Sequence, residues 1–206
     1  MAKATFPQPF GKYILLEKIA LGGMAELFRA KTIGAEGFER EVVIKRILPH
    51  FTEDENFTRM FIDEARIAAK LHHANVVQIF DFDKVDDTYY IAMEFVEGRD
   101  VKKIRERLKK ENVRIGVWQA VFVIIEVAKA LQYAHTRTHK GSPLNIIHRD
   151  VSPQNILVSY AGEVKLMDFG IAKAQERSTK TRAGTVKGKC AYMSPEQARG
   201  KPLDKR

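Results

Sequence analysis

Hydrophobic and polar residues alternate in three stretches near the start of the chain, which indicates short β-strands. These stretches cover residues 12–20, 26–32 and 39–48, and glycine-containing turns separate them. From residue 54 to residue 71 the apolar period lengthens to that of a helix, so the apolar side chains share one face. That face consists of Phe57, Met60, Phe61, Ile67, Ala68 and Leu71, with Glu64 among them.

The pattern changes character in the second half of the chain. Two further strands are predicted at 76–82 and 89–96, and an acidic turn joins them. After Gly98 the periodicity predicts a basic helix at 102–111 and a long apolar helix at 117–136. Short strands follow at 155–159 and 163–167. We therefore expect an α+β protein with a strand-rich first half, a helix-rich second half and a boundary near residues 97–100.

Composition favours a soluble globular protein, because 45% of the 206 residues are hydrophobic and 30% are charged. The best uninterrupted apolar run, residues 120–125, meets Glu126, so no membrane segment is expected in this chain. The N-terminus lacks the apolar core of a signal peptide. The single cysteine, Cys190, fits a reducing compartment. We expect a cytoplasmic location, with an anchor beyond Arg206 left open.

Basic residues outnumber acidic ones by 35 to 26, giving a formal charge of +9. Such a charge suits nucleic acid, an anionic membrane surface or a phosphorylated ligand. Much of it lies in residues 102–111, which read as the solvated side of a helix, and in residues 173–189, which read as a basic loop. Charge alone is weak support for nucleic-acid binding.

Two charged residues stand in otherwise apolar patterns. Lys45 ends the buried-looking run VVIK, and Glu64 falls on the apolar face of the first helix. Each charge is costly to bury alone, so we predict that the two form an ion pair. The alternative is a lysine that reaches solvent and a glutamate at the rim.

Small residues in the stretch IALGGMAEL, 19–27, could let the backbone approach phosphate groups closely. An ordinary hairpin turn explains the same pattern. Further along, the strand ending in KLMDFG presents Asp168 before a glycine turn. Together with Asn155 it offers the oxygen ligands that Mg²⁺ prefers.

The ordered set VVIK, Glu64, MEFVEG, HRDVSPQN, DFG and SPE resembles the catalytic domain of eukaryotic-like protein serine/threonine kinases, in their bacterial branch. The motifs follow that order over nearly the whole chain. The resemblance implies a bilobal fold, with a β-rich N-lobe and a helical C-lobe that clamp Mg·ATP.

The resemblance also assigns roles to five polar residues. Lys45 would hold the α- and β-phosphates and would be braced by Glu64. Asp168 would bind Mg²⁺, and Asn155 would serve the second metal site. Asp150 would orient the substrate hydroxyl and accept its proton.

Nucleotide contacts follow from the same resemblance. The carbonyl of Glu94 and the N–H of Val96 would contact adenine, and Asp100 would bind the ribose. The full implied set is Ile19, Ala20, Gly22, Gly23, Leu27, Val43, Lys45, Met93, Glu94, Val96, Asp100 and Leu157.

Arg149 precedes Asp150, as in kinases that phosphorylation of the activation loop switches on. A phosphate on that loop would pair with Arg149 and order the segment. Thr181 and Thr185 are the preferred acceptors.

Two positions depart from the family pattern. Ser152 stands where serine/threonine kinases usually carry a lysine, and Lys189 stands where they usually carry a threonine. We hypothesise an exchange, in which Lys189 reaches the γ-phosphate or Asp150 and Ser152 supplies the hydroxyl. The alternative is a site that lacks one cation and turns over slowly.

The family pattern divides the chain into an N-terminal extension at 1–12, an N-lobe at 13–97 and a partial C-lobe at 98–206. Family members continue after the SPE segment with helices that pack on the long helix from Val117. Without them that helix would expose apolar surface. We therefore expect a C-lobe that is incomplete.

The expected activity is transfer of the γ-phosphoryl group of ATP to serine or threonine hydroxyls of proteins. The proline-containing catalytic loop favours this over tyrosine specificity. A second copy of the chain could be a substrate, and no nucleic acid is expected as a partner. A weakly catalytic pseudokinase that binds nucleotide or acts as a scaffold is the alternative.

Overall fold

The structure is a computed structural model that describes residues 5–52, 54–169 and 190–205. The chain divides into two compact units. The first comprises Met1–Ala69 and Gln78–Phe95, and the second comprises Lys70–Val77 and Val96–Arg206. The segment Lys70–Val77 therefore groups with the second unit, although the sequence pattern assigned it to the N-lobe.

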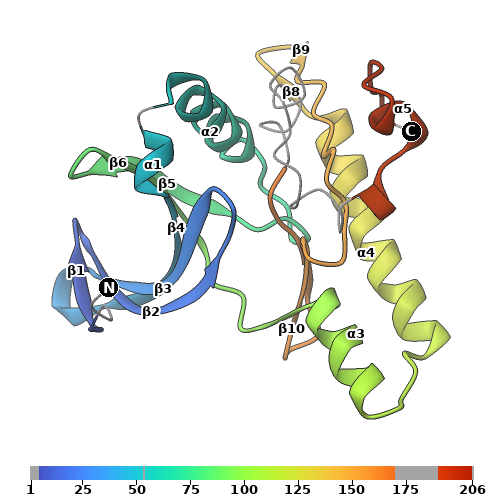
Figure 1. Cartoon of the computed structure of the whole chain (residues 1–206), viewed down its shortest axis with the longest axis horizontal. Coiled ribbons are helices and arrows are strands. Elements are labelled where there is room, and N and C mark those ends of the chain that lie inside the picture. Colours follow the sequence, from blue (N-terminus) through green and yellow to red (C-terminus); the bar gives the residue numbers. More distant parts are fainter. Residues whose placement is uncertain (1–4, 53, 170–189, 206) are drawn as a thin grey trace. The chain divides into compact units, whose positions relative to one another are not determined.

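The first unit is built on a six-stranded antiparallel sheet in the order β1-β2-β3-β4-β6-β5, which curls in Figure 1. Alternation of buried and exposed side chains along the central strands agrees with the sequence pattern. The strands are β1 (Gln8–Phe10), β2 (Tyr13–Leu21), β3 (Ala25–Ile33), β4 (Glu39–Ile47), β5 (Ile79–Val85) and β6 (Thr88–Glu94). Strand β1 lies within the stretch expected as an N-terminal extension.

Helix α2 (Glu55–Ala68) is the main helix of the first unit. The side chain of Asp54 caps its start by accepting hydrogen bonds from the N–H groups of Asn56 and Phe57. The helix ends earlier than the predicted residue 71, because the following segment joins the second unit. A short helix α1 (Pro49–Thr52) and a 3-10 turn (Ala35–Gly37) complete this unit.

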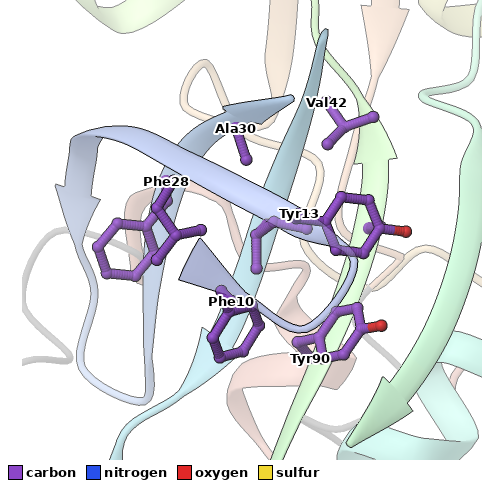
Figure 2. Close-up of a cluster of buried hydrophobic side chains, with 9 residues drawn as sticks. Phe10, Tyr13, Phe28, Ala30, Val42 and Tyr90 are labelled. Atoms are coloured by element: carbon purple, nitrogen blue, oxygen red, sulfur yellow. The ribbon is translucent and has the colours of Figure 1, made fainter. Parts of the chain in front are cut away.

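Aromatic residues dominate one core cluster of the first unit (Figure 2). Tyr13 and Tyr90 pack edge to face, and both hydroxyls donate to Asp81, which also pairs with Lys12 at 2.6 Å. Burial and the nearby carboxylate raise the pKa of Tyr90 to about 12. Burial alone would raise the pKa of Asp81, but the bonds from Lys12 and Tyr13 outweigh it and lower that pKa. The cluster ties β1, β2 and β6 together.

The second unit contains two small sheets and a set of helices. Strand β10 (Ile156–Ser159) pairs with β11 (Val164–Leu166) and with β7 (Gly98–Asp100). A Cβ atom at Gly98 would collide with the backbone of Val158, so this strand needs glycine there. The second sheet is the hairpin of β8 (Thr138–His139) and β9 (Ser142–Pro143). The sequence pattern did not predict this hairpin, because its strands are too short to show a period.

The helices of the second unit are α3 (Val101–Lys110), α4 (Val117–Thr136) and α5 (Pro195–Ala198), with a 3-10 turn at Cys190–Tyr192. Helix α4 buries Val127, Ala130 and Ala134 and packs against β11. Its other faces are apolar but exposed, as the sequence predicted; Trp118 is 83% exposed and Ile124 is 62% exposed. By length and composition alone, α4 is apolar enough to cross a membrane.

The predicted strand at 76–82 is partly wrong. Strand β5 begins only at Ile79, and the two preceding valines instead bond to the end of β11 in the second unit. Val77 donates its N–H to the carbonyl of Leu166 at 3.0 Å. Asn75 fixes this arrangement, because its side-chain amide donates to the carbonyl of Val164 and to Glu126. The apolar pattern alone cannot show whether these two valines continue β5 or bond to the end of β11.

Candidate active site

The predicted ion pair between Lys45 and Glu64 is present in the first unit. Nζ of Lys45 lies 2.9 Å from Oε1 of Glu64, and the two side chains are only 14% and 12% exposed. Strand β4 supplies the lysine and α2 supplies the glutamate. The ammonium also lies 5.9 Å from the ring centre of Phe61. A part-buried cation paired with a carboxylate suits an anionic ligand such as a phosphate.

The glycine-containing stretch forms the turn between β2 and β3. The N–H of Gly22 donates to the carbonyl of Ala25 at 2.8 Å, so the turn is a closed hairpin. Ala20 pairs with Leu27 within the strands, and neither Ala20 nor Ala25 has a positive φ. Alanine is therefore accommodated at both positions. The hairpin alone does not distinguish a phosphate loop from an ordinary turn.

The residues expected around adenine lie on neighbouring strands or at the start of the second unit. Leu27 pairs with Lys45 across β3 and β4, and Val43 pairs with Met93 across β4 and β6. The N–H of Glu94 donates to Gln78 at 2.8 Å. The members of the set in the first unit are Ile19, Ala20, Gly22, Gly23, Leu27, Val43, Lys45, Met93 and Glu94, and those in the second are Val96, Asp100 and Leu157.

Asp100 has a structural role beside the ribose contact expected of it. Its Oδ1 accepts the N–H of Lys103 at 2.9 Å and caps α3, and its Oδ2 lies 3.2 Å from Nζ of the same lysine. The residue also pairs with Leu157 across β7 and β10. The ribose role stays a prediction.

The second unit brings Asp150 and Asn155 together in one loop. Nδ2 of Asn155 donates to the carbonyl oxygen of Asp150 at 2.7 Å and to its carboxylate Oδ2 at 2.8 Å. The N–H of Asp150 donates to Nδ1 of His148 at 3.2 Å. Asn155 and His148 are buried, and Asp150 is half-buried. Asn155 therefore orients the carboxylate, and His148 fixes the backbone of the same residue.

The residue before Asp168 is held from two sides by the same loop. The N–H of Met167 donates to the carbonyl of Asn155 at 2.9 Å. The carbonyl of Met167 lies 3.0 Å from Nε2 of His148. Asp168 then adopts a φ of +55°, which aspartate tolerates better than most residues. These contacts bring the end of β11 to the loop that carries Asp150.

His148 is the residue that sequence reasoning named only as part of a motif. Because Nδ1 accepts a bond from the N–H of Asp150, the tautomer with its proton on Nε2 lets the ring donate to the carbonyl of Met167. The ring also packs on Phe169 at 4.6 Å between centres. His148 therefore positions both acidic residues of the site. A histidine two residues before a predicted catalytic aspartate was the available signal.

The oxygen ligands expected for Mg²⁺ fit the local chemistry. Both hydrogen bonds from the Asn155 side chain use the amide nitrogen, so Oδ1 is the atom that could coordinate a cation. Asp168 supplies a carboxylate from the adjoining segment. Among the described residues there is no group of three histidine, cysteine, aspartate or glutamate side chains of the kind that holds zinc. A hard cation that also takes ligands from phosphates fits such a sparse set.

Of the two residues in the expected exchange, Ser152 and Lys189, the structure describes only Ser152. Ser152 is 4% exposed, and its Oγ has no hydrogen-bond partner in the described part of the chain. The same holds for the buried Nε of Arg149, whose carbonyl oxygen accepts a bond from Gln197 at 2.6 Å. Lys189, Thr181 and Thr185 lie outside the described residues.

Comparison with known proteins decides the family. Residues 13–206 match the family model described as a protein kinase domain. The chain belongs to the protein kinase family. This family uses ATP as its substrate, which agrees with the fold and with the arrangement around Asp150.

Several characterised kinases are similar to this chain. It is 50% identical over 200 residues to the tyrosine-protein kinase MasK of Myxococcus xanthus, covering 97% of this chain and 31% of that protein. It is 38% identical over 190 residues to the serine/threonine-protein kinase PrkC of Bacillus subtilis, covering 92% of this chain and 27% of PrkC. The chain thus spans less than a third of the length of either relative.

Solved structures show the same fold. The PknI kinase domain of Mycobacterium tuberculosis superimposes with a TM-score of 0.70 and 26% sequence identity. The match covers 100% of this chain and 71% of the PknI chain. The predicted kinase fold, with a β-rich N-lobe and a helical part, is therefore confirmed.

Proposed function

We propose that this protein transfers the γ-phosphoryl group of ATP to serine or threonine hydroxyls of protein substrates. The observation that carries the proposal is the arrangement around Asp150, whose carboxylate accepts a bond from Asn155 while its backbone is fixed by His148. A carboxylate held in this way can orient a hydroxyl and accept its proton. Positioning supplies most of the catalysis in phosphoryl transfer, so a carboxylate in a fixed position suits this reaction.

In the proposed step the substrate oxygen attacks the γ-phosphorus and forms a new P–O bond. The bond from that phosphorus to the bridging β,γ-oxygen breaks, and ADP leaves with the electron pair. The hydroxyl proton passes to Asp150. Lys45, braced by Glu64, neutralises charge on the phosphates of ATP. Asn155 and Asp168 would hold Mg²⁺, which supplies further charge neutralisation when it is bound.

Serine/threonine specificity is proposed because Pro153 stands in the catalytic loop, and because several similar bacterial proteins are named serine/threonine kinases. Tyrosine specificity is a second candidate, because MasK, at 50% identity, is named a tyrosine-protein kinase. The two candidates share the same catalytic groups and differ only in the acceptor.

Phosphorylation by the full-length protein with Mg·ATP tests the proposal, with acceptor sites mapped by mass spectrometry. We expect phosphate on serine and threonine, both in the protein itself and in a general protein substrate. Mixing a tagged inactive Asp150→Asn copy with the active protein detects transfer between copies. Phosphate on tyrosine alone would favour the second candidate, and nucleotide binding without any transfer would favour a pseudokinase.

We further propose that Lys189 supplies the cation that kinases usually place at position 152. The support is that Ser152 is buried with a hydroxyl that has no partner within the described residues. A buried hydroxyl without a partner is costly, so a group from outside those residues is expected to bind it. A Lys189 side chain or the substrate itself could provide that group.

A double-mutant cycle over Ser152→Lys and Lys189→Thr tests this exchange. Ser152→Lys adds a second cation beside Lys189 and is expected to lower kcat about tenfold, and Lys189→Thr removes the proposed cation and is expected to lower kcat about 100-fold. The double variant restores the usual family arrangement, so we expect activity within about tenfold of the natural protein. Losses that simply multiply would contradict the exchange, provided that thermal melting shows all three variants to be folded.

We also propose that phosphorylation of Thr181 or Thr185 activates the protein through Arg149. The buried Nε of Arg149 makes no hydrogen bond within the described residues, which leaves it able to receive a phosphate. The mass-spectrometric mapping described above includes both threonines. Their phosphorylation should precede the rise in transfer to other substrates.

A further inference from the structure

The segment around α3 carries a large share of the excess positive charge of the chain. Residues 99–114 contain eight basic and three acidic residues, within a chain whose formal charge is +9. None of the α3 side chains is fully buried. The basic residues are Arg99, Lys102, Lys103, Arg105, Arg107, Lys109, Lys110 and Arg114.

The acidic residues of this segment are already paired. Each of the three carboxylates lies 2.6–3.8 Å from a basic side chain within one helical turn. Among the described residues, no carboxylate pairs with Arg105, Lys109 or Lys110. Exposed pairs of this kind contribute little to stability. Arg105 is therefore available to an acidic partner, and Lys102 can exchange its long, exposed contact of 3.8 Å with Glu106 for such a partner.

The charges are arranged by the helix period. Lys102, Arg105 and Lys109 follow the spacing i, i+3, i+7, so they share one face of α3. Ile104 and Leu108 are half-buried on the other side, where α3 packs near β7 and β10 (Figure 1). The basic face is thus directed away from the core of the second unit.

The start of this face lies against the catalytic loop. The backbone N–H of Lys102 donates to the carbonyl of Pro153 at 3.0 Å. Pro153 stands between Asp150, which is proposed to orient the acceptor hydroxyl, and Asn155, which is proposed to hold Mg²⁺. Arg105 follows about 4.5 Å further along the helix axis, which is little more than the length of one extended residue.

A second contact places the same face beside the segment that contains the SPE motif. Nη1 of Arg105 lies 3.4 Å from the hydroxyl of Tyr192, which is about half exposed. In the same segment, Gln197 donates to the carbonyl of Arg149, the residue before Asp150, at 2.6 Å. The basic face and the Tyr192 segment are therefore both tied to the loop that carries the catalytic aspartate.

We propose that Lys102 and Arg105 select protein substrates that carry acidic residues a few positions from the phosphoacceptor hydroxyl. The inference rests on the proposed kinase function, because it treats Asp150 as the place where the hydroxyl binds. Two exposed cations beside that point attract carboxylates and repel lysine and arginine. They act as specificity-determining residues and take no part in the chemistry.

A protein segment fits this surface better than a nucleic acid. The cations adjoin the catalytic loop, so they meet whatever chain presents the hydroxyl. Single-stranded nucleic acid is usually held by aromatic side chains interleaved with cations, and α3 itself contains no aromatic residue. The competing outcome of the test is that Lys102 and Arg105 bind DNA and not an acidic protein segment.

Fluorescence anisotropy with two labelled serine peptides tests the proposal in the full-length protein. The peptides are identical except that the residues flanking the serine are glutamate in one and lysine in the other. We expect the natural protein to bind the glutamate peptide at least tenfold more tightly in low salt, with the difference shrinking as salt is added. The variant Lys102→Glu/Arg105→Glu should reverse this preference.

Lys110→Glu is the control for position, because it reverses one charge on the same helix about 140° away from Arg105, which is half of the charge change in the double variant. It should keep the preference for the glutamate peptide. The proposal would be overturned if the natural protein, the double variant and Lys110→Glu all showed the same ratio of affinities for the two peptides. It would also be overturned if the double variant lost only DNA binding. The ratio of kcat/KM for the two peptides should follow the ratio of affinities. Selective binding without any phosphate transfer would support the docking surface and count against the kinase function.

Discussion

Asp150→Asn is expected to lower kcat for phosphate transfer by about 10²–10⁴-fold, with nucleotide affinity changed by no more than about threefold. The amide cannot accept the hydroxyl proton, but it has nearly the same shape as the carboxylate. Its oxygen can still accept the bond from Asn155 that the carboxylate accepts at 2.8 Å. The loss should therefore appear in the chemical step, measured with a fixed peptide substrate under saturating ATP.

Glu163→Gln is the matched control for this substitution. It makes the same carboxylate-to-amide change on an exposed residue of the turn between β10 and β11. Its kcat should remain within about twofold of the natural value. An Asp150→Asn variant that keeps more than about a tenth of the activity would show that another group accepts the proton. A fluorescent nucleotide titration separates this result from a loss of ATP binding.

The sequence was sufficient to predict the elements with long or chemically unusual patterns. The pairing of Lys45 with Glu64 could be predicted because each is a charge in an otherwise apolar pattern, and a single partner satisfies both. The long strands and α2 could be predicted because their periods extend over several repeats. These features depend on local pattern and on the cost of buried charge.

Features that depend on contacts distant in sequence were missed. Strands β1 and β7 have three residues each, which is too short for alternation to be recognised. The path of Val77 is set by Asn75, whose side chain bonds to Val164 and Glu126 far along the chain. His148 likewise acts through Met167, a contact that no local pattern reveals. The site's positioning residues are therefore harder to find from sequence than its charged ones.

Lys45→Met is expected to lower kcat/KM for ATP by about 10²–10³-fold. Two losses combine in this variant. The phosphates lose a cation, and Glu64, whose side chain is 12% exposed, becomes a buried charge without its 2.9 Å partner. Repulsion between that carboxylate and the phosphates should make the effect larger than the loss of one attraction.

Glu64 gives the means to separate those two losses. Glu64→Gln keeps the cation but removes its brace, so we expect a smaller loss of about 10–100-fold. The double variant Lys45→Met/Glu64→Gln no longer has the negative charge of Glu64. The activity of this variant should match or exceed that of Lys45→Met alone. A double variant whose loss equals the product of the single losses would mean that the two residues act independently.

Arg46→Met is the matched control, because Arg46 adjoins Lys45 on β4 but pairs with Glu26 at 2.8 Å. Its guanidinium also lies over the ring of Phe28 at 4.7 Å, so the substitution should lower the melting temperature. It should leave kcat/KM for ATP within about threefold of the natural value at a temperature where the protein is folded. A loss in Arg46→Met as large as that in Lys45→Met would show that activity depends on the stability of β4. If Arg46→Met keeps its kcat/KM for ATP, the loss in Lys45→Met is due to the Lys45–Glu64 pair.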